Sequence, residues 1–199
     1  MAGFDIVGVD IQEQPEYPFE FIQADALSVS DMLDEFDLVH ASPPCQGYTN
    51  MRNSYSTTRT GLIPEVRTML DGRQYVIENV VGARRFMRDP VLLRGSMFSM
   101  PLDRPRLFEC TFYVAQPPSS NSVWSKRLPV YGDANGRVVK VRKDGSELRA
   151  WKDVREGATA MSCGWMEQAH TIKEAIPPQY TYYLALWFLK QHYGWSGYG

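Results

Sequence analysis

The first half of the chain alternates short apolar runs with polar stretches. The runs that predict β-strands each end at an acidic residue or a turn, and they span 4–10, 19–22, 37–41 and 73–78. The stretches between them that predict short helices carry a serine cap or a leading proline, and they span 28–36 and 64–70. Strands separated by helices favour a mostly parallel sheet with helices on its faces, so we expect an α/β fold.

The second half has two different patterns. Residues 116–155 combine Pro, Gly and Ser with short Val-rich stretches, which predicts a small irregular or hairpin subregion. Residues 178–192 place apolar side chains at helical spacing, which predicts a helix packed on the sheet. We therefore expect a core over 1–115, a small inserted subregion over 116–155, and a return to the core over 156–199.

Composition is that of an ordinary soluble globular protein. The chain has 199 residues, of which 44% are hydrophobic and 22% charged, and this length fits one domain. No apolar run approaches the roughly 20 residues that span a bilayer. The first residues lack the basic and apolar regions of a signal peptide. We expect a cytoplasmic monomer without a membrane partner.

The cysteines and histidines do not form a recognisable metal or disulfide pattern. The three cysteines stand far apart without a Cys-x-x-Cys pair, and the three histidines complete no ligand cluster. We predict neither a disulfide framework nor a bound metal.

Charge is distributed unevenly along the chain. The net charge is −2, yet no Lys or Arg precedes Arg52, and all 21 basic residues follow from there. This asymmetry permits a basic face against nucleic-acid phosphates. On charge alone, a solvated charged surface remains the simpler interpretation.

A cysteine follows the third predicted strand. The sequence from Ala41 to Gly47 reads Ala-Ser-Pro-Pro-Cys-Gln-Gly, so an apolar strand leads through two prolines to Cys45. Ligands of open α/β sheets bind at the carboxyl ends of strands. Prolines stiffen the backbone, which would hold Cys45 in one place. A lone cysteine is more often a buried small hydrophobe, but this context favours a nucleophile.

A carboxylate follows the fourth predicted strand in the same way. Glu78 and Asn79 come directly after an apolar run, where a buried carboxylate is costly unless it has a partner or a function. A turn or a helix cap is the structural alternative for Asn79. If this strand lies beside the strand that leads to Cys45, a thiol and a carboxyl group meet, as addition to an electron-poor ring requires.

Two arginines follow later, in the sequence Arg104-Pro-Arg106. On an extended segment, residues two apart point the same way. They could hold a carbonyl, a phosphate or Glu78. A surface pair is the alternative.

Taken together and in this order, these motifs resemble the DNA cytosine C5 methyltransferase family. The elements that carry the resemblance are Pro43-Pro44-Cys45-Gln46, Glu78-Asn79-Val80 and Arg104-x-Arg106. The later stretches Trp165-Met166 and 175–181 resemble the closing motifs of its short bacteriophage or bacterial members. The resemblance runs over nearly the whole chain and implies a Rossmann-like methyltransferase fold.

The resemblance also implies a mechanism and a partner. Cys45 would attack C6 of a cytosine while Glu78 contacts N3, and Arg104 and Arg106 would support the cytosine carbonyl and the loop geometry. C5 would then take methyl from S-adenosyl-L-methionine. The cytosine would be flipped out of double-stranded DNA, and the loop over 46–61 would close over it. The basic 116–155 subregion, with Trp124, Tyr131 and Trp151, would contact the DNA.

The cofactor residues are likewise implied by the resemblance. Asp10 would bind the ribose hydroxyls and Asp25 the adenine amino group; the neighbours that would complete the pocket are Ile11, Ala26, Leu27 and Pro44. The structural alternative for Asp10 is a solvated strand end, and for Asp25 an Asx turn.

The sequence departs from the family pattern at its start. Members normally begin with a strand and a glycine-rich turn upstream of the position of Asp10, and Met1 to Phe4 match only the end of the following helix. We expect a start that lies downstream of the true one, or alternatively a truncated copy. The alternatives to a DNA methyltransferase are a tRNA cytosine C5 methyltransferase, an inactive nucleic-acid-binding relic and, more distantly, a thiol-redox protein. The recognition sequence and a role in restriction-modification stay open.

Overall fold

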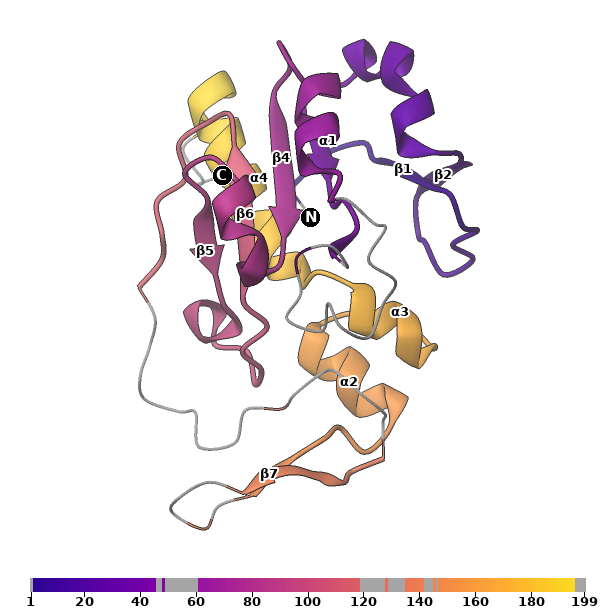
Figure 1. The fold of residues 1–199 in the computed structure, drawn as a ribbon, viewed down its shortest axis with the longest axis vertical. Coiled ribbons are helices and arrows are strands. Elements are labelled where there is room, and N and C mark those ends of the chain that lie inside the picture. The colour runs from indigo at the N-terminus through magenta and orange to yellow at the C-terminus, as the bar shows by residue number, and fades with distance from the viewer. Residues whose placement is uncertain are drawn as a thin grey trace. The chain divides into compact units, whose positions relative to one another are not determined.

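The computed structural model describes residues 2–45, 48, 61–118, 128, 135–141, 145 and 147–195. Its residues fall into two compact units, which are described one at a time. The first, here called the sheet unit, comprises residues 3–92 and 105–116. The second, here called the helical unit, is formed mainly by 93–104 and 117–199. Figure 1 shows the elements of both.

The sheet unit begins with a small parallel ladder. Strand β1 (Val7–Asp10) pairs with β2 (Glu20–Gln23), and Asp10 lies opposite Gln23 at the carboxyl end. Gly8 packs closely on Tyr17, because a Cβ atom there would lie 2.5 Å from the Tyr17 ring, which would have to move. None of the residues in these two strands is buried.

A second, larger sheet contains most of the core. Its strands are β3 (Val39–Ala41), β4 (Tyr75–Asn79), β6 (Arg106–Cys110) and β5 (Val91–Leu93), in that spatial order. Strand β4 runs parallel to β3 and antiparallel to β6. All five residues of β4 are buried, so this strand is the centre of the unit.

The prediction of a mostly parallel sheet is therefore wrong in part. The fold is mixed α/β, but among the described residues the strands form separate small sheets with both parallel and antiparallel pairs. The physical reason is that apolar runs mark strands without fixing their neighbours. Strand β6 also lies beyond the region from which the parallel arrangement was inferred.

One face of the larger sheet is covered by α1 (Ile63–Met69). Side chains alternate along a strand, so Tyr75, Ile77 and Asn79 share the face of β4 opposite to Glu78. Ile77 belongs to a buried cluster with Ile63 of α1 and Leu107 of β6. The expected helix over 28–36 is present as two 3₁₀ segments, Ala26–Ser28 and Ser30–Glu35.

A buried carboxylate ties α1 to this face. Glu109 of β6 is 2% exposed and accepts two hydrogen bonds of 2.7 Å from the guanidinium of Arg67 in α1. The Tyr75 hydroxyl, at 2.9 Å, and the Arg88 amide, at 2.7 Å, donate to the same carboxylate. Every partner is charged or a good donor, which is how a buried carboxylate is tolerated.

The helical unit contains a hairpin followed by three helices. Strands β7 (Val138–Val141) and β8 (Glu147–Arg149) pair antiparallel, as the composition of 116–155 predicts, with an irregular register next to Val138. Helices α2 (Val154–Met161), α3 (Ala169–Glu174) and α4 (Pro178–Tyr193) follow. The last confirms the helix predicted over 178–192.

Local chemistry explains where α2 begins. Asp153 accepts a hydrogen bond from the Glu156 amide at 2.8 Å, and the Glu156 side chain accepts one from the Lys152 amide at 2.6 Å. This pattern resembles a capping box, except that the Glu156 side chain bonds the amide of the residue before the cap. The indole of fully buried Trp151 lies against Gly157, where a Cβ atom would stand 1.7 Å from the ring. Within the described residues, no helix is both long and apolar enough to cross a membrane.

Candidate active site

Three strand ends of the sheet unit meet at one edge of the larger sheet. Strands β3 and β4 are parallel, with Ala41 opposite Ile77, so their carboxyl ends lie at the same edge. Strand β6 runs the other way, with Leu107 opposite Asn79, so it begins at that edge. The order of these strands therefore brings together the segment leading to Cys45, the Glu78-Asn79 pair and Arg106.

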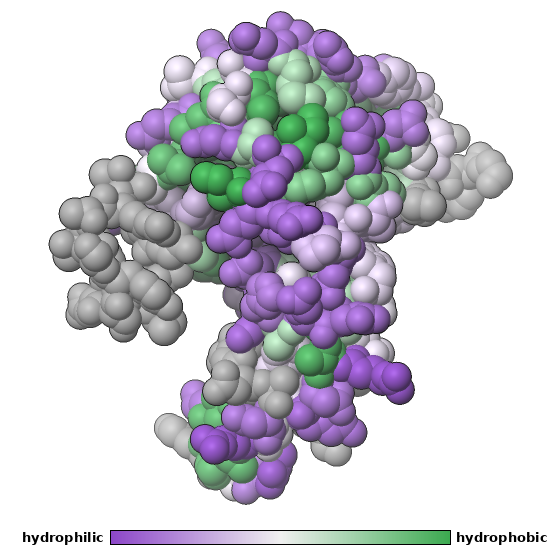
Figure 2. Space-filling view, turned by 90° about the vertical axis from the view of Figure 1, so that its right-hand side faces the viewer, coloured by the Kyte–Doolittle hydropathy of each residue, from purple (hydrophilic) through white to green (hydrophobic). Residues whose placement is uncertain are grey.

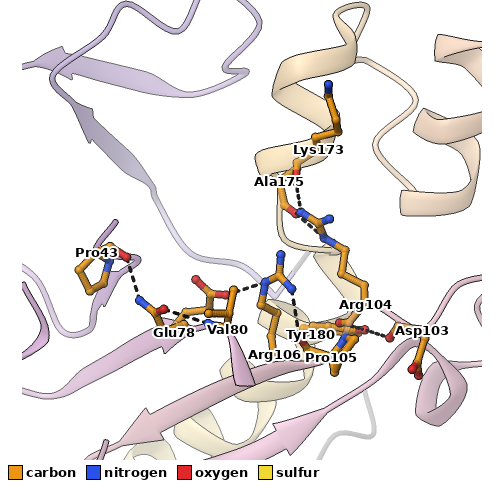
Figure 3. A network of polar contacts seen from close by, with 11 residues as sticks. Pro43, Glu78, Val80, Asp103, Arg104, Pro105, Arg106, Lys173, Ala175 and Tyr180 are labelled. Carbon is orange, nitrogen blue, oxygen red and sulfur yellow. Dashed lines mark hydrogen bonds and ion pairs between the residues drawn. The ribbon is translucent and has the colours of Figure 1, made fainter. Parts of the chain in front are cut away.

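Glu78 and Arg106 form an ion pair (Figure 3). The Arg106 Nε atom lies 3.0 Å from Glu78 Oε1, and the two side chains are only 18% and 8% exposed. The same guanidinium donates through an Nη atom to the Pro105 carbonyl at 3.0 Å. A polar group with this little exposure needs such a partner. Arg106 therefore fixes the direction of the Glu78 side chain.

Asn79 points to the other face of β4 and contacts the segment before Cys45. Its side-chain Nδ2 atom donates to the Pro43 carbonyl at 2.8 Å, and its Oδ1 atom accepts from the Val80 amide at 3.0 Å. Asn79 is 1% exposed, whereas Cys45 is half-buried. The strand that presents Glu78 thus also holds the backbone two residues before the thiol.

Tyr48 anchors the chain on the other side of Cys45. Its amide donates to the Cys45 carbonyl at 2.9 Å, and its hydroxyl accepts from the Ile63 amide at 3.2 Å. The side chain is buried, with its ring centroid 4.8 Å from that of Phe86. Neither Tyr48 nor this contact of Asn79 was predicted from the sequence. An aromatic residue within a polar run was the available signal for Tyr48.

The segment from Arg104 to Arg106 is not extended as expected, and the two arginines have different partners. Arg104 has a φ of 32°, in the left-handed region, so the segment is not extended there and side-chain alternation does not hold. Its guanidinium donates to the carbonyls of Lys173 and Ala175 in the helical unit (Figure 3). The Tyr180 hydroxyl lies 3.0 Å from the Arg104 carbonyl. Arg104 therefore joins the segment before β6 to the α3–α4 connection.

The two acids assigned to a cofactor lie at the ends of β1 and β2. Asp10 ends β1, and its Oδ1 atom accepts from the Gln12 amide at 2.8 Å. Asp25 follows β2, and its Oδ1 atom accepts from the Leu27 amide at 2.9 Å, capping the 3₁₀ segment that begins at Ala26. The Asx turn considered as an alternative for Asp25 is thus present. It leaves the second oxygen of the carboxylate for another donor.

Exposed apolar side chains accompany these acids. Ile11 is 67% exposed and Leu27 is 41% exposed, next to Asp10 and Asp25 respectively. Apolar patches lie among polar surface in the upper part of Figure 2. The two carboxylates accept hydrogen bonds, and the two apolar side chains lie exposed beside them, so these residues are compatible with a ligand that carries hydroxyl or amino donors and a flat ring. Ala26 and Pro44, also assigned to that pocket, are exposed.

The basic subregion is described only in part. Trp124, Tyr131 and most of the loop over 46–61 lie outside the described residues. In the β7–β8 hairpin, all four residues of β7 are exposed, including Lys140 and three valines, and green patches among purple mark it at the lower end of Figure 2. Arg149 of β8 pairs with Glu147 at 2.5 Å. The hairpin thus presents both apolar and basic side chains to solvent.

Metal ligands do not gather in the described part of the chain. No group of three or more His, Cys, Asp and Glu side chains there could hold an ion.

Comparison with known proteins gives little beyond this geometry. No protein-family description matches the chain, and no curated protein matches it. Among solved structures, it is similar to a mutant of Spodoptera frugiperda DNMT2, with 15% sequence identity and a TM-score of 0.41. The match covers 70% of this chain and 57% of that chain, so this chain spans little more than half of that protein. A similarity at this level carries no functional information.

Proposed function

We propose that the chain is a cytosine C5 methyltransferase that acts on double-stranded DNA. The observation that carries this proposal is the meeting of three motifs at one edge of the larger sheet. The segment of Cys45 follows β3, Glu78 lies at the end of the neighbouring β4, and Arg106 begins β6 and pairs with Glu78 at 3.0 Å. A nucleophile and a held carboxylate on adjacent strands suit addition to a pyrimidine ring.

Each residue has a distinct role in that addition. The Cys45 thiolate forms a bond to C6, and the displaced electron pair moves toward N3, which takes up a proton from the carboxyl group of Glu78. C5 thereby becomes nucleophilic and accepts the methyl group. Removal of the C5 proton then restores the double bond and releases Cys45. Arg106 holds Glu78 in place, and Arg104 supports the segment before β6 through the carbonyls of Lys173 and Ala175.

The methyl donor would be held by the β1–β2 ends. S-adenosyl-L-methionine supplies an activated methyl group when bound. Asp10 would accept from its ribose hydroxyls and Asp25 from its adenine amino group, with Ile11 and Leu27 against the ring. The exposure of both apolar side chains supports this assignment.

Basic side chains would contact the phosphates of DNA and RNA alike, so the shape of the hairpin is what favours DNA. The β7–β8 hairpin presents Lys140 and Arg149 on a two-stranded ribbon, an element that can enter the major groove. The target base cannot react within the stack and has to be flipped out, which costs about a few kcal/mol. The short hairpin is suited to a short recognition sequence.

The decisive experiment traps the covalent intermediate. DNA in which every cytosine carries fluorine at C5 needs no knowledge of the recognition sequence. Fluorine at C5 cannot leave as a proton does, so Cys45 stays bonded to C6. We expect a covalent protein–DNA complex on a denaturing gel, dependent on added S-adenosyl-L-methionine and absent in Cys45→Ser.

Matched variants and substrates complete this test. Cys110→Ser removes another thiol of the sheet unit and should leave the adduct intact. Glu78→Gln should lower turnover more than DNA affinity. Transfer of radiolabelled methyl to tRNA but not to DNA would shift the assignment to a tRNA methyltransferase. DNA binding without cofactor binding or any adduct would indicate a nucleic-acid-binding relic.

A further inference from the structure

The backbone on both sides of Cys45 is held by hydrogen bonds that the reaction itself does not use. Before the thiol, Asn79 donates to the Pro43 carbonyl at 2.8 Å. After it, the Tyr48 amide donates to the Cys45 carbonyl at 2.9 Å. Between these two anchors, Pro44 has its φ angle locked by its ring. Few backbone torsions are therefore left to move the thiol.

The Asn79 anchor depends on both atoms of a side-chain amide. Nδ2 donates to Pro43 while Oδ1 accepts from the Val80 amide at 3.0 Å, so the amide can adopt only one orientation. A carboxylate of the same shape would place an oxygen against the Pro43 carbonyl. Asn79 is 1% exposed, so water cannot replace the lost donor there.

The Tyr48 anchor depends on a neighbour without a side chain. A Cβ atom on Gly82 would lie 2.2 Å from the Tyr48 carbonyl oxygen, which is backbone and cannot turn aside. A Cβ on Gly61 would lie 1.8 Å from the Tyr48 hydroxyl oxygen. Gly82 is not among the glycines with a left-handed φ, so alanine is compatible with its own backbone. Gly82→Ala would therefore displace Tyr48 rather than strain residue 82.

We propose that Asn79 and Tyr48, with Gly82 making room for the latter, are positioning residues that hold the Cys45 thiol for attack. This inference rests on the proposed methyltransferase function. Nucleophilic attack requires the reacting atoms about 3–3.5 Å apart, and a displacement of 1 Å can cost about 100-fold in rate. Both faces of strand β4 would thus contribute to the reaction. Glu78 on one face contacts the cytosine ring, while Asn79 on the other face holds the segment that carries the nucleophile.

The test compares two variants, Asn79→Asp and Gly82→Ala, with the wild type. It measures the rate of Cys45 alkylation and the kcat for methyl transfer. A loosened segment exposes the half-buried thiol but misplaces it for catalysis. We expect alkylation of Cys45 by iodoacetamide to rise about tenfold, as the loss of one good hydrogen bond would allow. We expect kcat for methyl transfer to fall about 100-fold with little change in KM for DNA. Alkylation thus rises while kcat falls. Unfolding would raise the alkylation of all three cysteines and not of Cys45 alone.

The other thiols distinguish positioning from general loosening. Cys110 lies in the same unit, and burial raises its pKa to about 12, so it should alkylate slowly in every variant. Cys163 is 1% exposed in the helical unit. Peptide mapping by mass spectrometry reports all three cysteines in one experiment. A matching rise at Cys110 or Cys163 would mean general destabilisation and overturn the proposal.

Two further variants act as controls. Asn135→Asp makes the same chemical change at an exposed residue that uses only its Oδ1 atom, and should leave Cys45 alkylation unchanged. Tyr48→Phe keeps the ring and the amide but loses the contact with the Ile63 amide, so its effect should be smaller. Unchanged Cys45 alkylation in both Asn79→Asp and Gly82→Ala would refute the inference. A wild-type chain without methyl transfer would instead refute the proposed function, while the alkylation result would still decide whether the anchors hold.

Discussion

The two parallel strand pairs of the sheet unit both lead to candidate site residues but are supported very differently. Strands β3 and β4 lead to Cys45 and Glu78, and β4 is buried along its whole length between β3 and β6. Strands β1 and β2 lead to Asp10 and Asp25, yet neither contains a buried residue. The end of the β3–β4 pair is thus part of a buried core, whereas the acids at the ends of β1 and β2 are held by local turns.

This difference separates two tasks. A nucleophile and the carboxylate beside it must be placed accurately before the substrate arrives, which requires contacts from several elements. The Gln12 and Leu27 amides orient Asp10 and Asp25 through local turns, which is sufficient for residues proposed to accept hydrogen bonds from a cofactor. Substitutions near β4 should therefore damage stability together with catalysis, whereas substitutions near β1 and β2 should change binding more than stability.

The largest expected effect compares the same truncation in the two sheets. Ile77 is fully buried in β4, and Ile77→Ala should lower the free energy of unfolding by about 4 kcal/mol, because it leaves a cavity. Ile22 is half-buried in β2, and Ile22→Ala should cost about 1 kcal/mol. Urea denaturation followed by circular dichroism measures both. Equal losses would show that the β1–β2 ladder is as firmly packed as β4, and the comparison would fail.

The sequence predicted the positions of these strands well but not their surroundings. Apolar runs located β1 to β4 within a few residues, because burial of alternate or consecutive side chains leaves a local trace. That β6 pairs antiparallel with β4, and that β1 and β2 form a separate ladder, depends on contacts between distant residues. No local pattern records such contacts.

The second expected effect concerns the Glu109 carboxylate. Burial alone raises the pKa of Glu109, but hydrogen bonds from Arg67, the Arg88 amide and Tyr75 outweigh it, so its pKa lies below the ordinary 4.5. Glu109→Gln leaves Arg67 without its charged partner and should cost about 3 kcal/mol at neutral pH. Because the folded-state pKa is lowered, this stabilisation is present above pH 4.5 and is lost as the pH falls through the lowered value.

The measurement is denaturation of wild type and variant from pH 7 down to pH 3. The difference between them should shrink at the acid end. Asp34→Asn provides the control, since its partner Arg73 lies 2.6 Å away but the Asp34 side chain is 74% exposed. Breaking that pair should cost less than about 0.5 kcal/mol. A pH-independent difference for Glu109→Gln would contradict the assignment of a stabilising charge.

The candidate site was predictable as a set of motifs and less so as a geometry. Cys45, Glu78 and Arg106 were found because unusual residues follow apolar runs, and the structure places their strands side by side. The Glu109 network escaped notice because Arg67 and Glu109 are 42 positions apart and look like ordinary surface charges. The segment at Arg104 was expected to be extended, because nothing in the sequence Arg-Pro-Arg indicates a left-handed φ.

The smallest expected effect on stability tests the exposed side of the comparison. Asp25 caps the 3₁₀ segment through Oδ1, so Asp25→Ala should cost about 1 kcal/mol, whereas Asp25→Asn keeps an oxygen for the Leu27 amide and should cost little. The second atom of that asparagine is an amide nitrogen, which donates and cannot accept from an adenine amino group. Calorimetric titration with S-adenosyl-L-methionine should therefore show about tenfold weaker binding for Asp25→Asn at unchanged stability. This variant therefore separates the role of Asp25 in the turn from its proposed role in binding. In β4 the two roles are harder to separate, because the contacts that stabilise the strand also hold Glu78 and the segment before Cys45. Normal cofactor affinity in Asp25→Asn would remove the adenine assignment and leave Asp25 as a turn residue alone.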